Sequence, residues 1–119
     1  MSNRKRILIC DDEEGVRESL KLILEDDYDL IVATCGNDAI EKVKETPVDL
    51  AILDIKMPKM SGIEVLKSLK KILPSMKAII ASGYQSAEAA HESIKYGAGD
   101  YIVKPFDSKE VLKKVKAII

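Results

Sequence analysis

The sequence predicts an α/β protein with a doubly wound parallel sheet of five strands and five helices packed on both faces. Two observations favour this fold. Five short apolar segments alternate along the chain with five segments whose apolar residues recur at helical spacing. The short segments are continuously apolar, which is typical of strands that helices cover on both sides. Since a closed barrel would need eight such units, we expect an open sheet and a single domain over residues 1–119.

The predicted strands are short apolar runs that stop at polar residues. They cover residues 6–10, 30–33, 48–53, 76–81 and 100–103. The first predicted helix covers residues 14–25, where apolar side chains recur every three or four positions. The second helix follows the turn-forming residues 36–38, and Pro47 ends the connection to the third strand.

Residues that favour helix N-termini precede the other three helices. Ser61 and Glu64 match the S-x-x-E capping box, and a second box starts at Asp107. Ser86 is the expected cap of the fourth helix, and Gly97 is the residue expected to end it. These signals place the third helix after residue 61, the fourth over residues 87–96, and the last from residue 108 to the end of the sequence.

Composition narrows the classes of function. The chain has 19 Lys and Arg against 20 Asp and Glu, so its net charge of -1 gives no basic field for direct binding of nucleic acid. No apolar stretch approaches the ~18 residues needed to span a membrane, and the N-terminus lacks the pattern of a signal peptide. Cys10 and Cys35 are expected to be unpaired thiols, as in cytosolic proteins. We therefore expect a soluble cytoplasmic protein.

Polar residues directly follow four of the predicted strands. Asp11 and Asp12 follow the first strand, Asp54 follows the third, Ser82 follows the fourth and Lys104 follows the fifth. Each placement alone is ordinary, because acids and hydroxyls are common in turns. Together they are unusual, because the carboxyl ends of parallel strands meet at one edge of the sheet, where such folds bind ligands. We expect these side chains to form one site.

Three carboxylates at one edge require a cation, and their hard oxygen ligands suit Mg²⁺. A lysine and a hydroxyl are suitable donors to phosphoryl oxygens, so the set indicates in-line phosphoryl transfer onto Asp54. One alternative is a Mg²⁺-dependent phosphohydrolase with an Asp nucleophile. Such enzymes usually carry a second acid two residues after the nucleophile, where this chain has Lys56. A binding module of the same fold that is never phosphorylated is a second alternative, but no acid of the set is missing.

The same residues resemble the receiver domain of bacterial two-component response regulators. The resemblance rests on Asp11–Asp12, Asp54, the Met57–Pro58 and Gly62 loop, Ser82, and Lys104–Pro105. It implies a flavodoxin-like sheet of strand order 2-1-3-4-5. It also implies a signalling switch rather than a conventional enzyme, one that catalyses only its own phosphorylation and dephosphorylation. The phosphoryl group would come from a phosphohistidine on a sensor histidine kinase or a phosphotransfer protein.

The resemblance further implies a role for each site residue. Asp12 would bind Mg²⁺ directly and Asp11 through water, while Asp54 and the backbone carbonyl of Lys56 complete the protein ligands. Lys104 would pair with a phosphoryl oxygen, and the peptide bond before Pro105 is commonly cis in this family.

The family's switch residues also have counterparts in this chain. Ser82 would donate to the phosphoryl group, and Tyr101 would turn inward in response. The surface formed by the helix at 87–96, the strand at 100–103 and the last helix would then change shape, and it is a possible homodimer surface. Tyr84 is positioned to shield the phosphoryl group from water.

Overall fold

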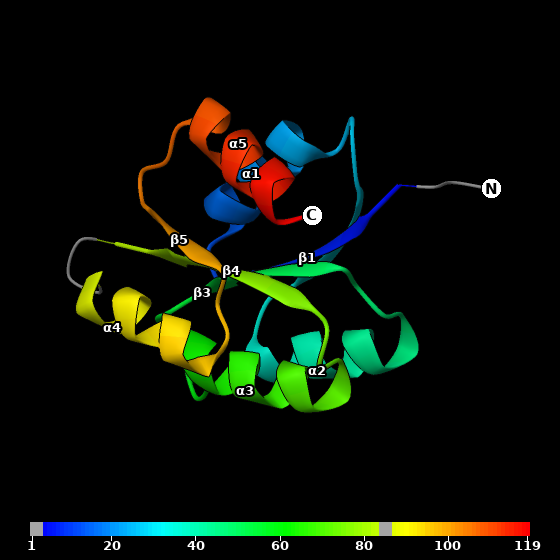
Figure 1. The fold of residues 1–119 in the computed structure, drawn as a ribbon, viewed down its shortest axis with the longest axis vertical. Helices are drawn as coiled ribbons and strands as arrows, with labels where there is room; N and C mark the ends of the chain where they lie inside the picture. Colours follow the sequence, from blue (N-terminus) through cyan, green and yellow to red (C-terminus); the bar gives the residue numbers. More distant parts are fainter. Residues whose placement is uncertain (1–3, 84–86) are drawn as a thin grey trace.

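A five-stranded parallel sheet forms the centre of the structure (Figure 1). The computed structural model describes residues 4–83 and 87–119. The strand order is β2-β1-β3-β4-β5, which confirms the predicted doubly wound sheet. The strands are β1 (Arg6–Cys10), β2 (Asp29–Ala33), β3 (Leu50–Asp54), β4 (Lys77–Ser82) and β5 (Asp100–Val103).

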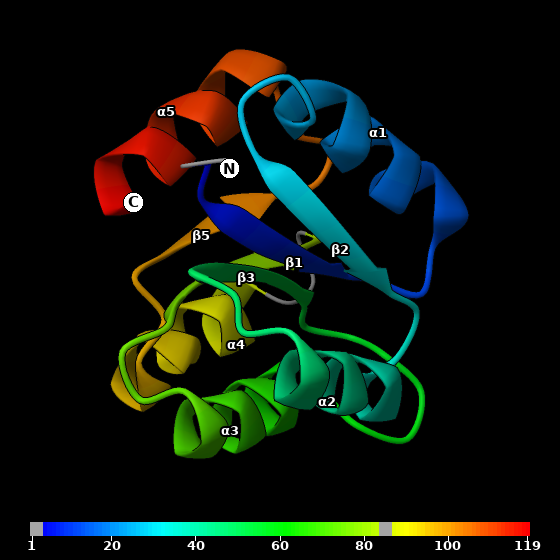
Figure 2. The same cartoon turned by 90° about the vertical axis from the view of Figure 1, so that its right-hand side faces the viewer.

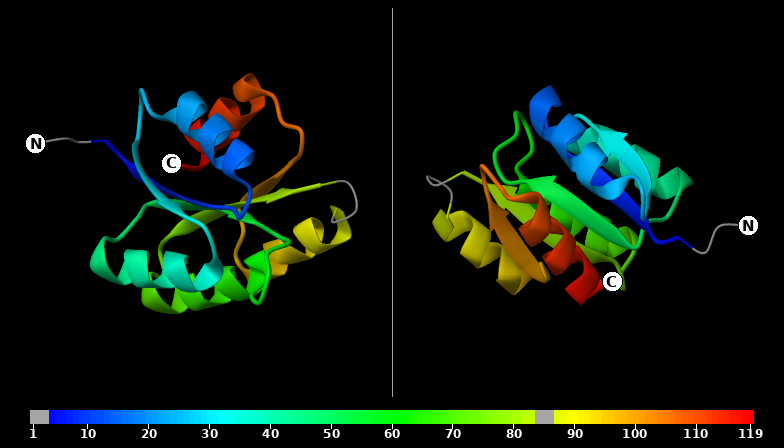
Figure 3. Two further views of the ribbon diagram at one scale, coloured as in Figure 1. Left: turned by 180° about the vertical axis from the view of Figure 1, so that it is seen from behind. Right: turned by 90° about the horizontal axis from the view of Figure 1, so that it is seen from above.

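Helices cover both faces of the sheet. The helices α1 and α5 lie on one face, and α2, α3 and α4 lie on the other (Figures 1 and 3). The fourth helix is shorter than expected, because only six residues are α-helical before a 3₁₀ turn that Gly97 ends at a φ of 104°. The bounds are α1 (Glu14–Leu24), α2 (Gly36–Glu45), α3 (Gly62–Ile72), α4 (Ala87–Glu92), η2 (Ser93–Tyr96) and α5 (Ser108–Ile118).

Alternate residues of each strand pack on opposite faces of the sheet, so the core has two halves. Leu8, Leu53 and Ile80 belong to the half beneath α2 and α3. Ile9 and Ile52 belong to the half beneath α1 and α5. Figure 2 shows the two helix layers on either side of the strands. This burial on both faces explains why the strands are continuously apolar in sequence.

The two predicted capping boxes have different outcomes. The Ser61 hydroxyl accepts a hydrogen bond from the Glu64 N–H at 3.2 Å, which confirms the cap of α3. Asp107 is the N-cap residue of α5, so the predicted start of this helix is confirmed. Its side chain makes no capping hydrogen bond, so the predicted capping box is wrong. A capping motif in sequence fixes the start of a helix more reliably than it fixes the side-chain rotamer.

The start of α2 also differs from the prediction. Its N-cap is Cys35, which makes no side-chain cap, whereas the sequence favoured residues 36–38. The Asp38 carboxylate instead accepts a hydrogen bond from the Thr34 N–H at 3.2 Å. Asp38 therefore bonds to the residue before the N-cap and is not itself the N-cap residue. Ser86, the cap expected for the fourth helix, and Tyr84 lie outside the described residues.

Strand register brings the polar strand ends to a common edge. Cys10 pairs with Leu53, so Asp11 follows β1 at the level where Asp54 ends β3. Ser82 pairs with Val103, which places Lys104 one residue beyond the end of β4.

Within the described ranges, no helix has the length and apolar character needed to cross a membrane.

Gly62 allows the first turn of α3 to pack directly against the end of β3. A Cβ atom added at Gly62 would lie 2.3 Å from the backbone oxygen of Asp54. The Gly62 N–H also donates to the Ile55 carbonyl at 3.0 Å. Because these neighbours are backbone atoms, they cannot move aside without displacing Asp54.

We predict that Gly62→Ala lowers the free energy of unfolding by at least about 2 kcal/mol, because the added methyl overlaps rigid backbone. The measurement is urea unfolding followed by circular dichroism. Gly15→Ala in α1 is the matched control, since nothing lies within 4 Å of the position of its added Cβ. That variant should be as stable as the original chain or more stable, by up to about 1 kcal/mol. Equal stability of the two variants would contradict the close-packing argument.

Candidate functional site

Lys104 joins two buried carboxylates at the carboxyl edge of the sheet. Its Nζ lies 2.9 Å from Asp11 Oδ2 and 3.2 Å from Asp54 Oδ1. The exposed fraction is 1% for Asp11 and 4% for Asp54. The sequence predicted that these three residues meet, and the structure brings them together. Their contact spans 93 residues of chain between Asp11 and Lys104.

Strand periodicity explains why these side chains face one another. Each lies two residues beyond an isoleucine of the core half beneath α1 and α5, and residues two apart in a strand point to the same face. The isoleucines are Ile9, Ile52 and Ile102. Backbone hydrogen bonds continue the sheet past the strand ends, from Asp11 N–H to the Ala33 carbonyl at 3.3 Å and from Lys104 N–H to the Ser82 carbonyl at 2.6 Å.

The site holds more negative than positive charge. Burial raises the pKa of Asp54 to about 6, and the nearby Asp11 charge adds to this, while Lys104 lowers it in part. Burial alone would lower the pKa of Lys104, but hydrogen bonding and the charges of Asp11 and Asp54 outweigh it and raise the pKa overall. One lysine therefore cannot compensate both acids.

The acids form a cluster that fits a small divalent cation. Oxygen atoms of Asp11, Asp12, Glu13 and Asp54 all lie within 4.8 Å of one another. Oxygens on opposite sides of a Mg²⁺ ion are about 4.2 Å apart, so this cluster needs little adjustment. Asp12 is exposed and Asp54 is buried, an arrangement that leaves part of the ion's shell open to water or phosphate. The donor set therefore fits Mg²⁺.

Glu13 belongs to the cluster, although its sequence position did not predict a role in the site. Its Oε1 lies 3.6 Å from Lys104 Nζ, and its backbone N–H donates to Asp11 Oδ1 at 2.9 Å. Its side chain is 65% exposed, so the ion pair is weak. The available signal was the run of four acids, Asp11 to Glu14, in which Glu13 is the N-cap residue of α1.

Ser82 lies at the edge, but its hydroxyl makes no hydrogen bond to the acids. It is fully buried, and its Oγ has no hydrogen-bond partner within the described ranges. The preceding Ile80 belongs to the core half beneath α2 and α3, so strand periodicity aims Ser82 away from the face that carries Asp54. A buried hydroxyl without a partner costs free energy, and such a group needs an explanation.

Two further predicted residues lie around the site. The Lys56 N–H donates to Asp54 Oδ1 at 3.4 Å, so the loop after β3 bends back over the carboxylate. Tyr101 is half-buried in β5, and Lys114 of α5 donates to its carbonyl at 2.6 Å. The Lys104–Pro105 peptide bond is cis, as the family resemblance implied.

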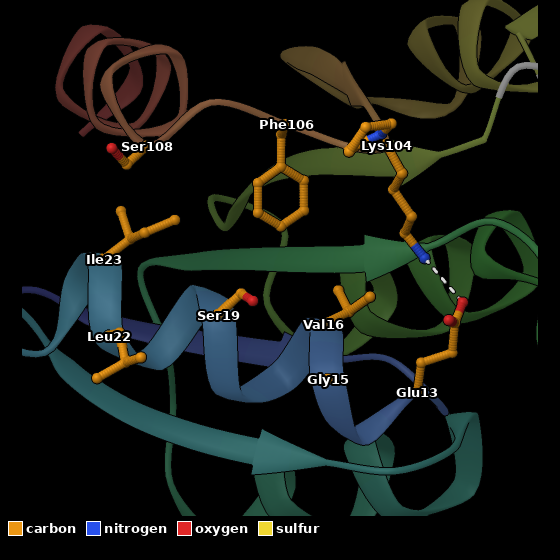
Figure 4. Close-up of a pocket in the computed structure, with 10 residues that line it drawn as sticks. Glu13, Gly15, Val16, Ser19, Leu22, Ile23, Lys104, Phe106 and Ser108 are labelled. Carbon is orange, nitrogen blue, oxygen red and sulfur yellow. Dashed lines mark ion pairs between the residues drawn. The ribbon is translucent and has the colours of Figure 1, made fainter.

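An apolar groove opens beside Lys104, between α1 and the loop that leads into α5 (Figure 4). Its volume is about 750 Å³. Figure 4 shows Lys104 reaching past the end of β3 toward Glu13, and the Phe106 ring between the loop and α1. Leu22, on the rim, is 72% exposed. The groove is lined by Glu13, Gly15, Val16, Ser19, Leu22, Ile23, Lys104, Pro105, Phe106 and Ser108.

Comparison with known sequences identifies similar proteins. The sequence profile described as "Response regulator receiver domain" matches residues 7–116. The chain is 40% identical over 116 residues to the chemotaxis protein CheY of Thermotoga maritima, and the match covers 96% of this chain and 97% of that protein. It is 36% identical to the alkaline phosphatase synthesis transcriptional regulatory protein PhoP of Bacillus subtilis. That match covers 97% of this chain but only 48% of PhoP.

Solved structures give the same result. A CheY-like response regulator receiver domain protein from Methanospirillum hungatei superimposes with a TM-score of 0.90 at 38% identity, covering 97% of this chain and 93% of that one. A response regulator receiver domain protein from Clostridium thermocellum superimposes with a TM-score of 0.90 at 31% identity, covering 97% and 94%. In both cases the similarity extends over nearly the whole of each chain.

The raised pKa of Asp54 predicts that Asp54→Asn stabilises the metal-free protein at neutral pH. Burial makes the folded-state pKa, about 6, higher than the ordinary 3.8. The folded state therefore holds the proton more tightly, and this contribution is lost as pH rises through about 6. The gain in free energy of unfolding for Asp54→Asn should be near zero at pH 4 and on the order of 3 kcal/mol above pH 7. Urea unfolding in EDTA at several pH values measures it.

Two controls accompany this measurement. Asp26→Asn removes an exposed charge and should leave the pH profile unchanged. Added Mg²⁺ should stabilise the original chain more than Asp54→Asn, because a cation compensates the buried carboxylate. A variant no more stable than the original chain at pH 8 in EDTA would show that Asp54 is already compensated.

Proposed function

The chain belongs to the response regulator receiver domain family, and on that basis we propose that it is a phosphoacceptor switch in which Asp54 is the acceptor. The observation that carries this assignment is the buried pair of Asp11 and Asp54 bridged by Lys104. We extend the proposal to a single receiver domain over residues 1–119. Its catalysis would be limited to its own phosphorylation and dephosphorylation.

Phosphoryl transfer would use the second carboxylate oxygen of Asp54, Oδ2. Its Oδ1 receives the contacts from Lys104 and the Lys56 N–H, which leaves Oδ2 for the attack on phosphorus. The new Oδ2–P bond forms as the bond from phosphorus to the leaving group breaks. In a phosphohistidine donor, the imidazole nitrogen departs with the electron pair. Lys104 is placed to transfer its contact from the carboxylate to a phosphoryl oxygen.

The proposed cofactor is Mg²⁺, which would neutralise charge between the acids and the phosphoryl oxygens. Asp12 and Asp54 would ligate it directly, and Asp11 through water. The backbone carbonyl of Lys56 is the fourth protein ligand that we propose. The Lys56 N–H contact supports this role, because it holds the same loop residue against Asp54.

We assign Ser82 and Tyr101 to the response. The buried Ser82 Oγ has no partner among the described residues, and a phosphoryl oxygen would supply one once Ser82 turns toward Asp54. Movement of Ser82 would shift the end of β4 and let Tyr101 turn inward. The face formed by α4, β5 and α5 would then change shape and could serve as a homodimer surface. Lys114 connects two of these elements, since it lies 3.6 Å from Asp100 and bonds to the Tyr101 carbonyl.

The proposed phosphodonor is a sensor histidine kinase or a phosphotransfer protein, acting in the cytoplasm. The groove of Figure 4 supports a protein donor, because apolar side chains line it and Lys104 lies at one end. An apolar helix seated there would place its histidine near Asp54. The net charge of -1 gives no reason to propose nucleic acid as a direct partner of this domain.

We predict that acetyl phosphate with Mg²⁺ adds one phosphoryl group to the chain, because the site needs only a small donor. Intact-mass spectrometry measures the product. Asp54→Ala should abolish the mass shift, and EDTA should reduce it strongly. Ser82→Ala should retain the mass shift, since its hydroxyl acts after transfer.

The same samples distinguish the alternative of a phosphohydrolase. A switch should release at most about one equivalent of phosphate per chain from para-nitrophenyl phosphate on the timescale of the assay. A hydrolase would release many equivalents per chain. Absence of any mass shift in a folded sample with Mg²⁺ would refute the proposed acceptor. Sustained turnover that depends on Asp54 would replace the switch with the hydrolase.

We predict that Leu22→Asp slows transfer from a phosphorylated histidine phosphotransfer protein by at least about tenfold. The docked donor would bury Leu22, and the variant would place a charge in that apolar contact. Labelling by acetyl phosphate should be unchanged, since Leu22 lies on the outer rim of the groove. Ile94→Asp is the matched control, because Ile94 is also exposed, at 46%, but belongs to η2. Equal effects of the two variants would argue against docking in the groove.

A further inference from the structure

The connection from Asp11 to Glu13 carries three of the four acids in the cluster at the sheet edge. It joins the end of β1 to α1, whose first residue is Glu14. The Asp11 side chain is buried, whereas Asp12 and Glu13 are exposed. Packing therefore holds one of these acids, and the other two depend on the conformation of the connection itself.

The Asp12 carboxylate has the least support among these acids. The carboxylates of Asp11 and Glu13 both contact Lys104 Nζ, at 2.9 and 3.6 Å. Within residues 4–83 and 87–119, the Asp12 carboxylate makes no hydrogen bond or ion pair. The backbone on either side of Asp12 must therefore set the direction of this side chain.

Arg17 holds that backbone from the first turn of α1. Its Nη1 donates to the Asp11 carbonyl oxygen at 2.9 Å, and its backbone N–H donates to the Glu13 carbonyl oxygen at 3.1 Å. The first bond fixes the peptide unit between Asp11 and Asp12, because a peptide unit is planar and turns as one body. Arg17 thus contacts the chain on both sides of Asp12.

Neither ion pairing nor helix stability accounts for an arginine at this position. Arg17 forms no ion pair with a carboxylate in the part of the chain that the structure describes. The helix dipole disfavours a positive charge near a helix N-terminus. The contact that Arg17 makes is with a backbone oxygen, and its side chain is half-buried. A charged donor makes a stronger hydrogen bond to such an oxygen than a neutral one.

We propose that Arg17 is a positioning residue that holds Asp12 in the direction required to bind Mg²⁺. This inference rests on the proposed Mg²⁺ site and assigns a role to a residue that is not itself a ligand. Replacing a residue that orients a metal ligand typically weakens metal binding by about 10- to 100-fold.

The charge of Arg17 has the opposite effect on Mg²⁺ from its hydrogen bond. A positive charge beside the acidic cluster repels a cation, so its removal alone would strengthen Mg²⁺ binding. Loss of the hydrogen bond to the Asp11 carbonyl would release Asp12 and weaken Mg²⁺ binding. The sign of the change in affinity therefore distinguishes positioning from charge.

The test is calorimetric titration of Mg²⁺ into the metal-free protein. Arg17→Met removes the guanidinium and keeps an aliphatic side chain, and it should weaken Mg²⁺ binding by at least about tenfold. Arg17→Gln is a second variant that stays polar, and the same weakening is expected. Unchanged or tighter Mg²⁺ binding in both variants would refute the positioning role.

Lys21→Met is the matched control. Lys21 lies one turn further along the same face of α1, and its Nζ is 3.5 Å from the exposed Glu18 carboxylate. The variant removes the same charge without removing a contact to the acidic connection. Its Mg²⁺ affinity should be unchanged or slightly higher, and weakening equal to that of Arg17→Met would refute the assignment.

A second measurement examines the connection without metal. In EDTA, NMR relaxation of the original chain should give backbone order parameters of about 0.85 at Asp12 and Glu13, as in rigid backbone. Arg17→Met should lower both toward about 0.6, while Leu20, which is buried in α1, stays unchanged and shows that the variant is folded. Unchanged order parameters at Asp12 and Glu13 would refute the inference alone. Absence of Mg²⁺ binding by the original chain would refute the proposed cofactor, and with it the role of Arg17 toward that ion.

Discussion

Repulsion between two buried carboxylates is the constraint on which the carboxyl edge of this sheet depends. Asp11 and Asp54 are held by strands that are buried on both faces, so neither can move away from the other. Lys104 satisfies them in part from a third strand. The remaining negative charge suits the edge to a cation, and in the proposed function a cation together with Lys104 would hold a phosphoryl group. The chemistry thus follows from a charge imbalance that the fold cannot relieve.

The rigidity of the surrounding backbone gives this imbalance its effect. Hydrogen bonds extend the sheet beyond its strands to Asp11 and to Lys104, and Gly62 lets α3 pack against the Asp54 carbonyl. A flexible edge would let the acids turn toward water and lose their interaction. Here the backbone holds the acids in place, which in the proposed reaction would lower the cost of organising the transferring phosphoryl group.

Much of the fold and site could be predicted from the sequence, because both depend on backbone periodicity. Continuous apolar strands gave the sheet, and polar residues at strand ends gave Asp11, Asp54 and Lys104. Predictions that depend on a single rotamer were less successful, as the absent side-chain cap of Asp107 shows. Glu13 was missed because its place in the cluster depends on how α1 begins.

The alternation of side chains across the sheet also limits how this chain can change in length. Asp11, Asp54 and Lys104 share one face because each is an even number of residues beyond a core isoleucine. Insertion of a single residue within β3 would turn Asp54 to the opposite face, away from Lys104, even if every other contact were retained. The strands that carry the acids must therefore keep their length for the three side chains to stay on one face of the sheet.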